Sequence, residues 1–210
     1  MSGAQFSNTS TGDKAADPYK SVNLDEAGLK EKVEGLLSFV DSSKFGMMTT
    51  RQGESGLLVS RCMALAGKEN GIDLLFHTNT ESGKTDDLTS DSNINVAFLN
   101  GSGEWASISG NASIITDREM VRKHYSSALK AWVGDLGDGK HDGGPEDPRI
   151  GIILVNMRTA TYAVTEQTII GRSAEVAKGV LTGNAPSVNK LRGLNEEEVK
   201  NYRQSHKIVK

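Results

Sequence analysis

Cysteine is almost absent from this chain of 210 residues: Cys62 is the single one, so no disulfide can form within the chain. That scarcity fits a reducing compartment, and we expect a cytoplasmic protein. No apolar run approaches the length that a bilayer requires, and residues 1–17 lack the apolar core of a signal peptide. We therefore expect no membrane association.

A strong net charge and an aromatic core are also missing. The formal net charge is −3, which argues against a protein that coats nucleic acid, because such proteins display a dominant basic face. Aromatic residues make up 5%, so the core must consist of Leu, Val, Ile, Met and Ala. The length suits one domain with extensions, or at most two small domains, and allows a substantial core without disulfides or metal.

Short strand-like segments fill the middle of the chain. An amphipathic helix that Asn23 or Asp25 caps comes first, and Asp117 caps a later helix through about Ala131. We expect a loop over 134–147, a polar helix over 196–205 and a bulge or bend at Gly110. The expected strands are residues 45–50, 57–66, 72–78, 94–99, 105–116, 149–156 and 159–164. About seven short strands with few helices are typical of an antiparallel barrel or sandwich.

Residues 76–84 carry the most informative pattern. A strand ends at Thr78, a tight turn follows, and Ser82 and Lys84 open a short helix. A helix start offers unpaired N–H groups and partial positive charge, which suit a phosphate; the alternative is an ordinary capped surface helix. Arg61 lies in a largely apolar strand, where a charge is costly unless it is paired. Its planar fork suits a phosphate, although it could instead face solvent or a carboxylate.

Phe76, Thr78, Asn79, Ser82 and Lys84 resemble the F-x-T-N-x-x-S-x-K motif of pyridoxamine 5'-phosphate oxidases. A closer resemblance, over about residues 40–165, is to the general stress protein 26-like split barrels, which include blue-light-inducible stress proteins of fungi. The stretches that match are 60–63, 76–88, 95–98, 105–117, 131–132 and 147–150.

The resemblance implies a fold of mainly β structure with α: a six-stranded antiparallel Greek-key split β-barrel with flanking helices. It further implies a homodimer with FMN in a cleft between subunits. We expect a disordered arm over 1–22, the FMN-binding barrel over 23–165, and a C-terminal extension over 166–210 that packs on the barrel or on the dimer partner. The expected cofactor-binding residues are Arg61, Cys62, Met63, Phe76, His77, Thr78, Ser82, Lys84, Trp105 and Trp132; no metal site is expected.

Several of these residues have an alternative interpretation. His77 could contact the flavin ring or be satisfied by a neighbour, and Trp105 and Trp132 could cover the ring or pack in the core or the dimer. Cys62 is expected to be a small buried hydrophobic residue next to the site. The hydroxyls of Ser107 and Ser109 share one face of a strand and could reach the cofactor across the dimer.

The sequence departs from the oxidases at the substrate side of the site. Ala64-Leu65-Ala66 lacks the lysine that helps hold their substrate, and Ala128 stands where they carry an arginine. We therefore expect FMN binding without pyridoxamine-phosphate oxidase activity. One hypothesis is a stress-related oxidoreductase that transfers electrons from a reduced nicotinamide to an unknown acceptor. The alternatives are a non-catalytic protein for FMN storage or sensing, and a scaffold that has lost FMN or prefers deazaflavin or haem.

Overall fold

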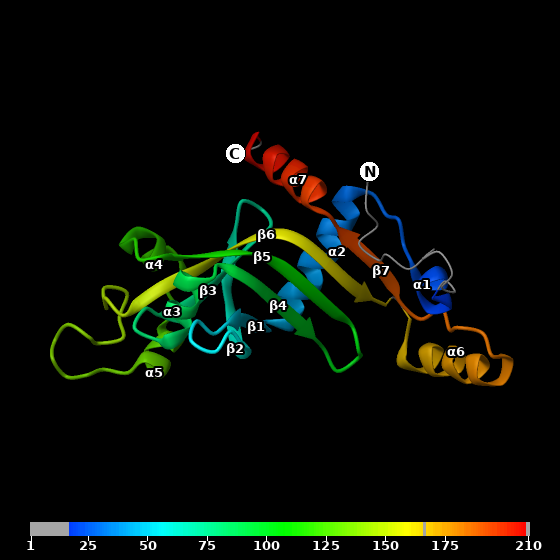
Figure 1. Ribbon diagram of the computed structural model, residues 1–210, viewed down its shortest axis with the longest axis horizontal. Helices are drawn as coiled ribbons and strands as arrows, with labels where there is room; N and C mark the ends of the chain where they lie inside the picture. Colours follow the sequence, from blue (N-terminus) through cyan, green and yellow to red (C-terminus); the bar gives the residue numbers. More distant parts are fainter. Residues whose placement is uncertain (1–16, 166, 209–210) are drawn as a thin grey trace.

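Seven strands form one antiparallel sheet in the computed structural model, which describes residues 17–165 and 167–208 (Figure 1). The sheet order is β3-β2-β1-β4-β5-β6-β7, and β3 also pairs with β6. This extra pairing closes the first six strands into a barrel, which confirms the six-stranded antiparallel barrel. The strands are β1 (Phe45–Arg51), β2 (Leu58–Glu69), β3 (Asp73–Asn79), β4 (Asn93–Leu99), β5 (Trp105–Ile115), β6 (Ile150–Val164) and β7 (Lys190–Leu194).

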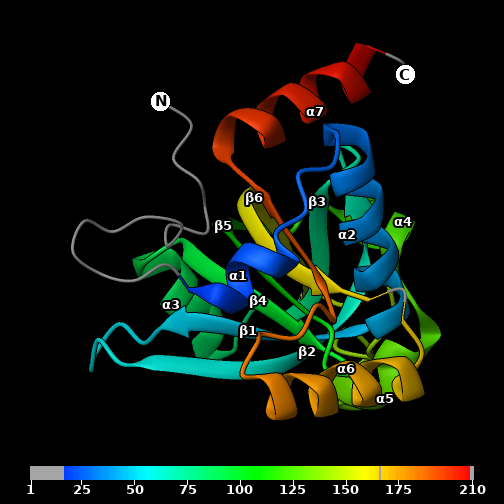
Figure 2. The same cartoon turned by 90° about the vertical axis from the view of Figure 1, so that its right-hand side faces the viewer.

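The barrel interior is mainly aliphatic, as the composition predicts. Side chains alternate between the two faces of each strand, so every second residue enters the core. The helix α2 (Leu29–Ser43) adds one apolar face to the same cluster and lies along the barrel (Figure 2). The largest side chains that are fully enclosed include Tyr162, Phe76, Phe98, Leu36, Met48, Ile72 and Ile108.

Gly110 marks the bulge predicted in the long fifth strand. The register of β5 against β6 shifts between Ser109 and Gly110. A Cβ at position 110 would lie 2.1 Å from the backbone oxygen of Asn156, so the two strands approach too closely there for any side chain. The glycine is therefore a packing requirement of the barrel.

Residues 149–156 and 159–164 were predicted as two strands, and this is wrong: β6 is continuous from Ile150 to Val164. One edge of β6 pairs with β5 throughout. Its other edge pairs with β3 up to Val155 and with β7 from Ala160 onward. The apolar pattern breaks where β6 exchanges one neighbour for the other.

Two helix boundaries also differ from the prediction. Gly28 precedes α2, whereas Asn23 closes a separate short helix and accepts hydrogen bonds from the backbone of Val188 and Asn189. Asp117 does cap the helix that follows it, but that helix ends at His124 instead of continuing to Ala131. The helices besides α2 are α1 (Pro18–Asn23), α3 (Gly83–Ser90), α4 (Arg118–His124), α5 (Lys130–Val133), α6 (Ile169–Thr182), α7 (Glu196–Ile208) and the 3-10 turn Ser127–Leu129.

The described parts of both predicted terminal segments contain secondary structure that the pattern does not indicate. Residues 1–16 of the predicted arm lie outside the described residues, but α1 occupies the remainder of it. Within the predicted extension, the polar helix is confirmed as α7, whereas α6 and β7 were not predicted. No helix in residues 17–165 and 167–208 is long and apolar enough to cross a membrane.

Candidate functional site

The end of the barrel beneath α3 gathers the polar residues of the predicted phosphate motif. Strand β3 ends at Asn79, and α3 begins at Gly83 after Ser82, which occupies the N-cap position. Arg61 and Met63 lie on the same face of β2, and Met63 packs against the barrel core. Arg61 therefore points toward the end of the barrel that α3 covers.

Lys84 is held by two hydroxyl groups of the motif. Its Nζ donates to Thr78 Oγ1 at 2.7 Å and to Ser82 Oγ at 3.0 Å. Ser82 Oγ in turn donates to Asn79 O at 2.7 Å, which fixes the turn between β3 and α3. Three predicted residues therefore form one hydrogen-bonded group.

Arg61 is anchored on the other side of this group. Nη1 donates to Thr50 Oγ1 at 2.8 Å, and Nη2 lies 3.0 Å from Asp87 Oδ2. Asp87 also accepts the backbone N–H of Gly53, so it ties the turn of the β1–β2 hairpin to α3. Sequence reasoning missed Thr50 and Asp87. The available signal was their position: Thr50 shares the inward face of β1 with Met48, and Asp87 stands one helical turn after Lys84.

The two cations are close enough to influence each other. Burial lowers the pKa of Lys84 below its ordinary value, and the charge of Arg61 lowers that pKa further. Asp87 is the anion paired with Arg61, whereas the Lys84 ammonium is hydrogen-bonded to two neutral hydroxyl groups. Such a cluster gains stability when a further anion arrives.

A hollow of about 380 Å³ opens beside Arg61, between the hairpin turn and α3. The hairpin extends beyond the rest of the barrel in Figure 2. Its turn contributes the backbone of Gly53 and the exposed carboxylate of Glu54. The hollow is lined by Gln52, Gly53, Glu54, Arg61, Gly83, Asp86, Asp87 and Ser90.

The two residues before Thr78 serve the fold. Phe76 is fully enclosed in the core, so its side chain does not reach the polar cluster. His77 is half-buried, and its Nε2 lies 2.9 Å from the carbonyl oxygen of His124. A carbonyl accepts only from a protonated nitrogen, so the neutral ring carries its hydrogen on Nε2. This geometry matches the interpretation in which a neighbouring group, here the His124 carbonyl, satisfies the hydrogen bonding of the His77 ring.

Cys62 and the tryptophans lie away from the barrel interior. The expectation that Cys62 is buried is wrong: it faces outward on β2, opposite Met47, because its two strand neighbours face inward. Trp132 is 88% exposed on α5, so it does not pack in the core of this chain, and Trp105 is half-buried at the start of β5.

The loop over 134–147 is confirmed as lacking helix and strand, but it is fixed at its end. Arg149 donates to the carbonyl oxygens of Val133, Gly134 and His141, and its guanidinium is paired with Asp147 at 2.6 Å. The hydrogen bond from Arg149 is the main reason why the pKa of Asp147 falls to about 2. This buried pair holds the loop against the barrel.

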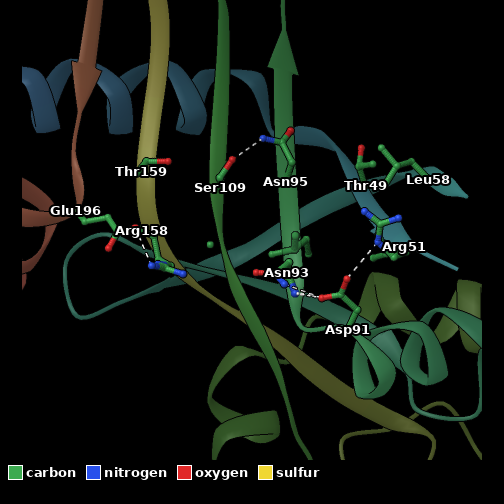
Figure 3. Close-up of a pocket in the computed structure, with 13 residues that line it drawn as sticks. Thr49, Arg51, Leu58, Asp91, Asn93, Asn95, Ser109, Arg158, Thr159 and Glu196 are labelled. Carbon is green, nitrogen blue, oxygen red and sulfur yellow. Dashed lines mark hydrogen bonds and ion pairs between the residues drawn. The ribbon is translucent and has the colours of Figure 1, made fainter. Parts of the chain in front are cut away.

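A second hollow, of about 330 Å³, lies on the outer face of the sheet over β1, β4, β5 and β6 (Figure 3). Ion pairs stand at two of its sides: Arg51 with Asp91 at 3.4 Å, and Arg158 with Glu196 at 2.7 Å. Between them Asn95 Nδ2 donates to Ser107 Oγ at 2.8 Å and Ser109 Oγ at 3.1 Å. The two serine hydroxyls predicted to share a face do so, and they hydrogen-bond to Asn95.

Within the described part of the chain, no group of three His, Cys, Asp or Glu side chains could hold a metal ion.

Comparison with known proteins matches most of the chain to one family and to one relative. The family described as "Pyridoxamine 5'-phosphate oxidase like" matches residues 31–187. "Protein bli-3" of Neurospora crassa is 62% identical over 209 residues, which cover 98% of this chain and 100% of that protein.

Solved structures share the fold at low identity. A putative general stress protein 26 from Jannaschia sp. CCS1 gives a TM-score of 0.58 at 19% identity, over 80% of this chain and 99% of that one. A pyridoxamine 5'-phosphate oxidase-related, FMN binding protein from Nostoc punctiforme gives a TM-score of 0.51 at 12% identity, over 80% and 97% of the two chains.

Proposed function

The chain belongs to the pyridoxamine 5'-phosphate oxidase-like family, and from that premise we propose that it binds FMN through Arg61 and Lys84. The observation that carries the proposal is the position of these two cations at one end of the barrel, where burial and, to a smaller extent, the charge of Arg61 lower the pKa of Lys84. Two like charges held together at a half-buried position favour a bound dianion.

The donor set fits a phosphate monoester. A guanidinium and an ammonium supply charge-assisted hydrogen bonds, and the first turn of α3 adds backbone N–H groups and partial positive charge. The hydroxyls of Thr78 and Ser82 hold the Lys84 ammonium in place. The Nostoc relative described as FMN binding lends support, as does the stress-protein description of the Jannaschia structure.

Bound FMN would supply redox chemistry, with a reduced nicotinamide as the electron donor and an acceptor of unknown identity. The residues of this chain orient the phosphate through Arg61 and Lys84. Neutral His77, fixed to the His124 carbonyl, stiffens the end of β3 that leads into the phosphate turn. We propose no pyridoxamine-phosphate oxidase activity, since Ala64-Leu65-Ala66 and Ala128 supply no cation for a second phosphate.

We further propose a homodimer with FMN at its interface. The outer face of β1 and β2 exposes Phe45, Met47 and Cys62, with Met47 directly opposite Cys62, and it exposes Leu58 beyond the polar pair of Thr49 and Ser60. Exposed apolar side chains with polar neighbours are typical of a protein–protein contact. The polar hollow of Figure 3 lies beside Leu58, and its hydroxyl and amide groups would face the second copy. The single exposed cysteine suits a cytoplasmic setting.

Storage or sensing of FMN without turnover is the second candidate function. The apolar segment 64–66 next to the motif favours it, because no cation there would hold a charged substrate. An NADH or NADPH oxidation assay with common acceptors separates the two: turnover that depends on bound FMN supports the oxidoreductase, and its absence in an FMN-loaded protein supports storage.

The binding proposal itself is tested by the visible spectrum and by calorimetry. We expect the purified protein, after incubation with FMN and desalting, to retain a flavin absorption band. We expect riboflavin, which lacks the phosphate, to bind more weakly. Equal affinity for FMN and riboflavin would overturn the assignment of Arg61 and Lys84.

A further inference from the structure

The hollow beside Arg61 has charges opposite to those of the proposed phosphate site. On the side of Lys84, Arg61 faces an ammonium and two hydroxyl groups. On the side of the hairpin turn, the hollow carries the carboxylates of Glu54, Asp86 and Asp87, and Arg61 is the one basic side chain among its lining residues. Arg61 therefore stands between the ammonium of Lys84, which attracts an anion, and a hollow in which three carboxylates outnumber the one cation.

We propose that Glu54 and Asp86 select flavin mononucleotide against flavin adenine dinucleotide; this inference rests on the proposed FMN site. The dinucleotide carries a second phosphate directly attached to the first, with an adenosine beyond it. When the first phosphate binds Arg61 and Lys84, the second must leave the cation pair, and the adjoining space is the hollow that these carboxylates line.

Asp87 makes this arrangement rigid. Its carboxylate accepts hydrogen bonds from Arg61, Thr50 and the backbone N–H of Gly53, and it is buried. Glu54 and Asp86 are exposed, and they carry their charges at the rim of the hollow. The hairpin turn is also pinned to α3 by Asp87, which keeps Glu54 near the hollow. Repulsion from these two rim charges acts more strongly on a second phosphate in the hollow than on the first, which the two cations hold.

The experiment measures dissociation constants of riboflavin, FMN and the adenine dinucleotide by calorimetry at low salt. The proteins are the wild type, the double variant Glu54→Gln/Asp86→Asn, and the control Glu34→Gln/Glu119→Gln. The control removes the same number of negative charges from exposed positions on α2 and α4, away from the hollow. Asp87 is left unchanged because its loss would disturb Arg61.

We expect the wild type to prefer FMN over the dinucleotide by about tenfold or more, and the Glu54/Asp86 variant to narrow that ratio by about three- to tenfold. The control should keep the wild-type ratio. Equal wild-type affinity for the two flavin nucleotides would overturn the inference while leaving the FMN site intact, as would a ratio that the Glu54/Asp86 variant leaves unchanged. FMN that binds no more tightly than riboflavin would instead remove the proposed function, and with it the inference.

Discussion

Arg61 and Asp87 face each other across the end of the barrel, with Nη2 of the arginine 3.0 Å from Oδ2 of the aspartate. The pair joins β2 to α3, and Lys84 precedes Asp87 on the same helix by one turn. The aspartate therefore fixes the guanidinium and lies on the same helix as the second cation. Binding and stability of this site can be separated by changing the three residues individually.

Replacing either cation should weaken FMN binding. We expect Arg61→Ala and Lys84→Ala each to cost about 1.5–3 kcal/mol of binding free energy, because each removes charge-assisted hydrogen bonds to the phosphate. Riboflavin binding should change little, since it has no phosphate. Calorimetry on both ligands measures the difference. Lys68→Ala is the control, because Lys68 lies on the same strand as Arg61 but is paired with Asp41. Unchanged FMN affinity in both site variants would contradict the assignment.

Removing Asp87 should loosen the hairpin turn. In Asp87→Ala, the Thr50 hydroxyl, the Arg61 guanidinium and the Gly53 N–H all lose an acceptor. We expect the free energy of unfolding to fall by about 1–3 kcal/mol and the Gly53 amide to exchange faster with solvent deuterium. Asp86→Ala, at an exposed neighbouring position, is the matched control. Equal Gly53 exchange in the two variants would show that Asp87 does not hold the turn.

The sequence was sufficient for the barrel and for the turn between β3 and α3. Alternating patterns and turn residues such as Asn70 and Gly71, both with positive φ, mark the hairpins locally. For the charge of Arg61 within an apolar strand, the sequence left a phosphate, solvent or a carboxylate as partner, and the structure pairs it with the carboxylate of Asp87. The hairpins and the turn were predictable because each depends on a few consecutive residues.

The remaining features depend on distant parts of the chain. Asp87 is separated from Arg61 by 26 residues, and nothing in the local sequence of α3 identifies its partner. Cys62 is apolar enough to suit a core. Side chains alternate between the two faces of β2, however, so Cys62 faces outward because its neighbours Arg61 and Met63 face inward. Strand β7 is short, and it becomes a strand through its pairing with β6.

The bulge at Gly110 should tolerate no side chain. An added Cβ would meet the Asn156 oxygen at 2.1 Å, and backbone on both sides would have to move. We expect Gly110→Ala to lower the free energy of unfolding by about 1–3 kcal/mol or more, as overpacking does. Urea unfolding measures this, with Gly101→Ala as the control, because no atom lies within 4 Å of a Cβ there. Equal midpoints for the two variants would contradict the packing argument.

His77 should make stability depend on pH below neutrality. Burial lowers its pKa below the ordinary value of 6.5, although the hydrogen bond to the His124 backbone partly opposes this shift. As pH falls below about 6.5, the unfolded chain takes up the proton first, so the free energy of unfolding decreases toward the folded pKa. His124 and Glu69 lie nearby and remain in both proteins compared. We expect the wild type to lose more free energy of unfolding than His77→Gln when the pH is lowered from 7 to 5. Urea unfolding at each pH measures it, and a constant difference would contradict the prediction.

The contact between Asp73 and Arg203 should control how firmly α7 is attached to the barrel. Asp73 is fully buried, and it receives Arg203 Nη2 at 2.6 Å and Nε at 3.1 Å; Arg203 also donates to the Met157 carbonyl. Arg203→Met would leave a buried carboxylate without its cation, so we expect a loss of about 3–5 kcal/mol. Arg158→Met, which breaks an exposed pair with Glu196, should cost no more than about 1 kcal/mol.

Adding Asp73→Asn to the Arg203→Met variant distinguishes charge burial from lost packing. The neutral amide of Asn removes the uncompensated charge, so part of the lost stability should return, while Met157 N keeps an oxygen acceptor at position 73. Urea unfolding of the single and double variants measures the recovery. If the double variant is no more stable than Arg203→Met, the cost comes from the lost contacts of the arginine stem with the barrel, and the buried ion pair is not what attaches α7.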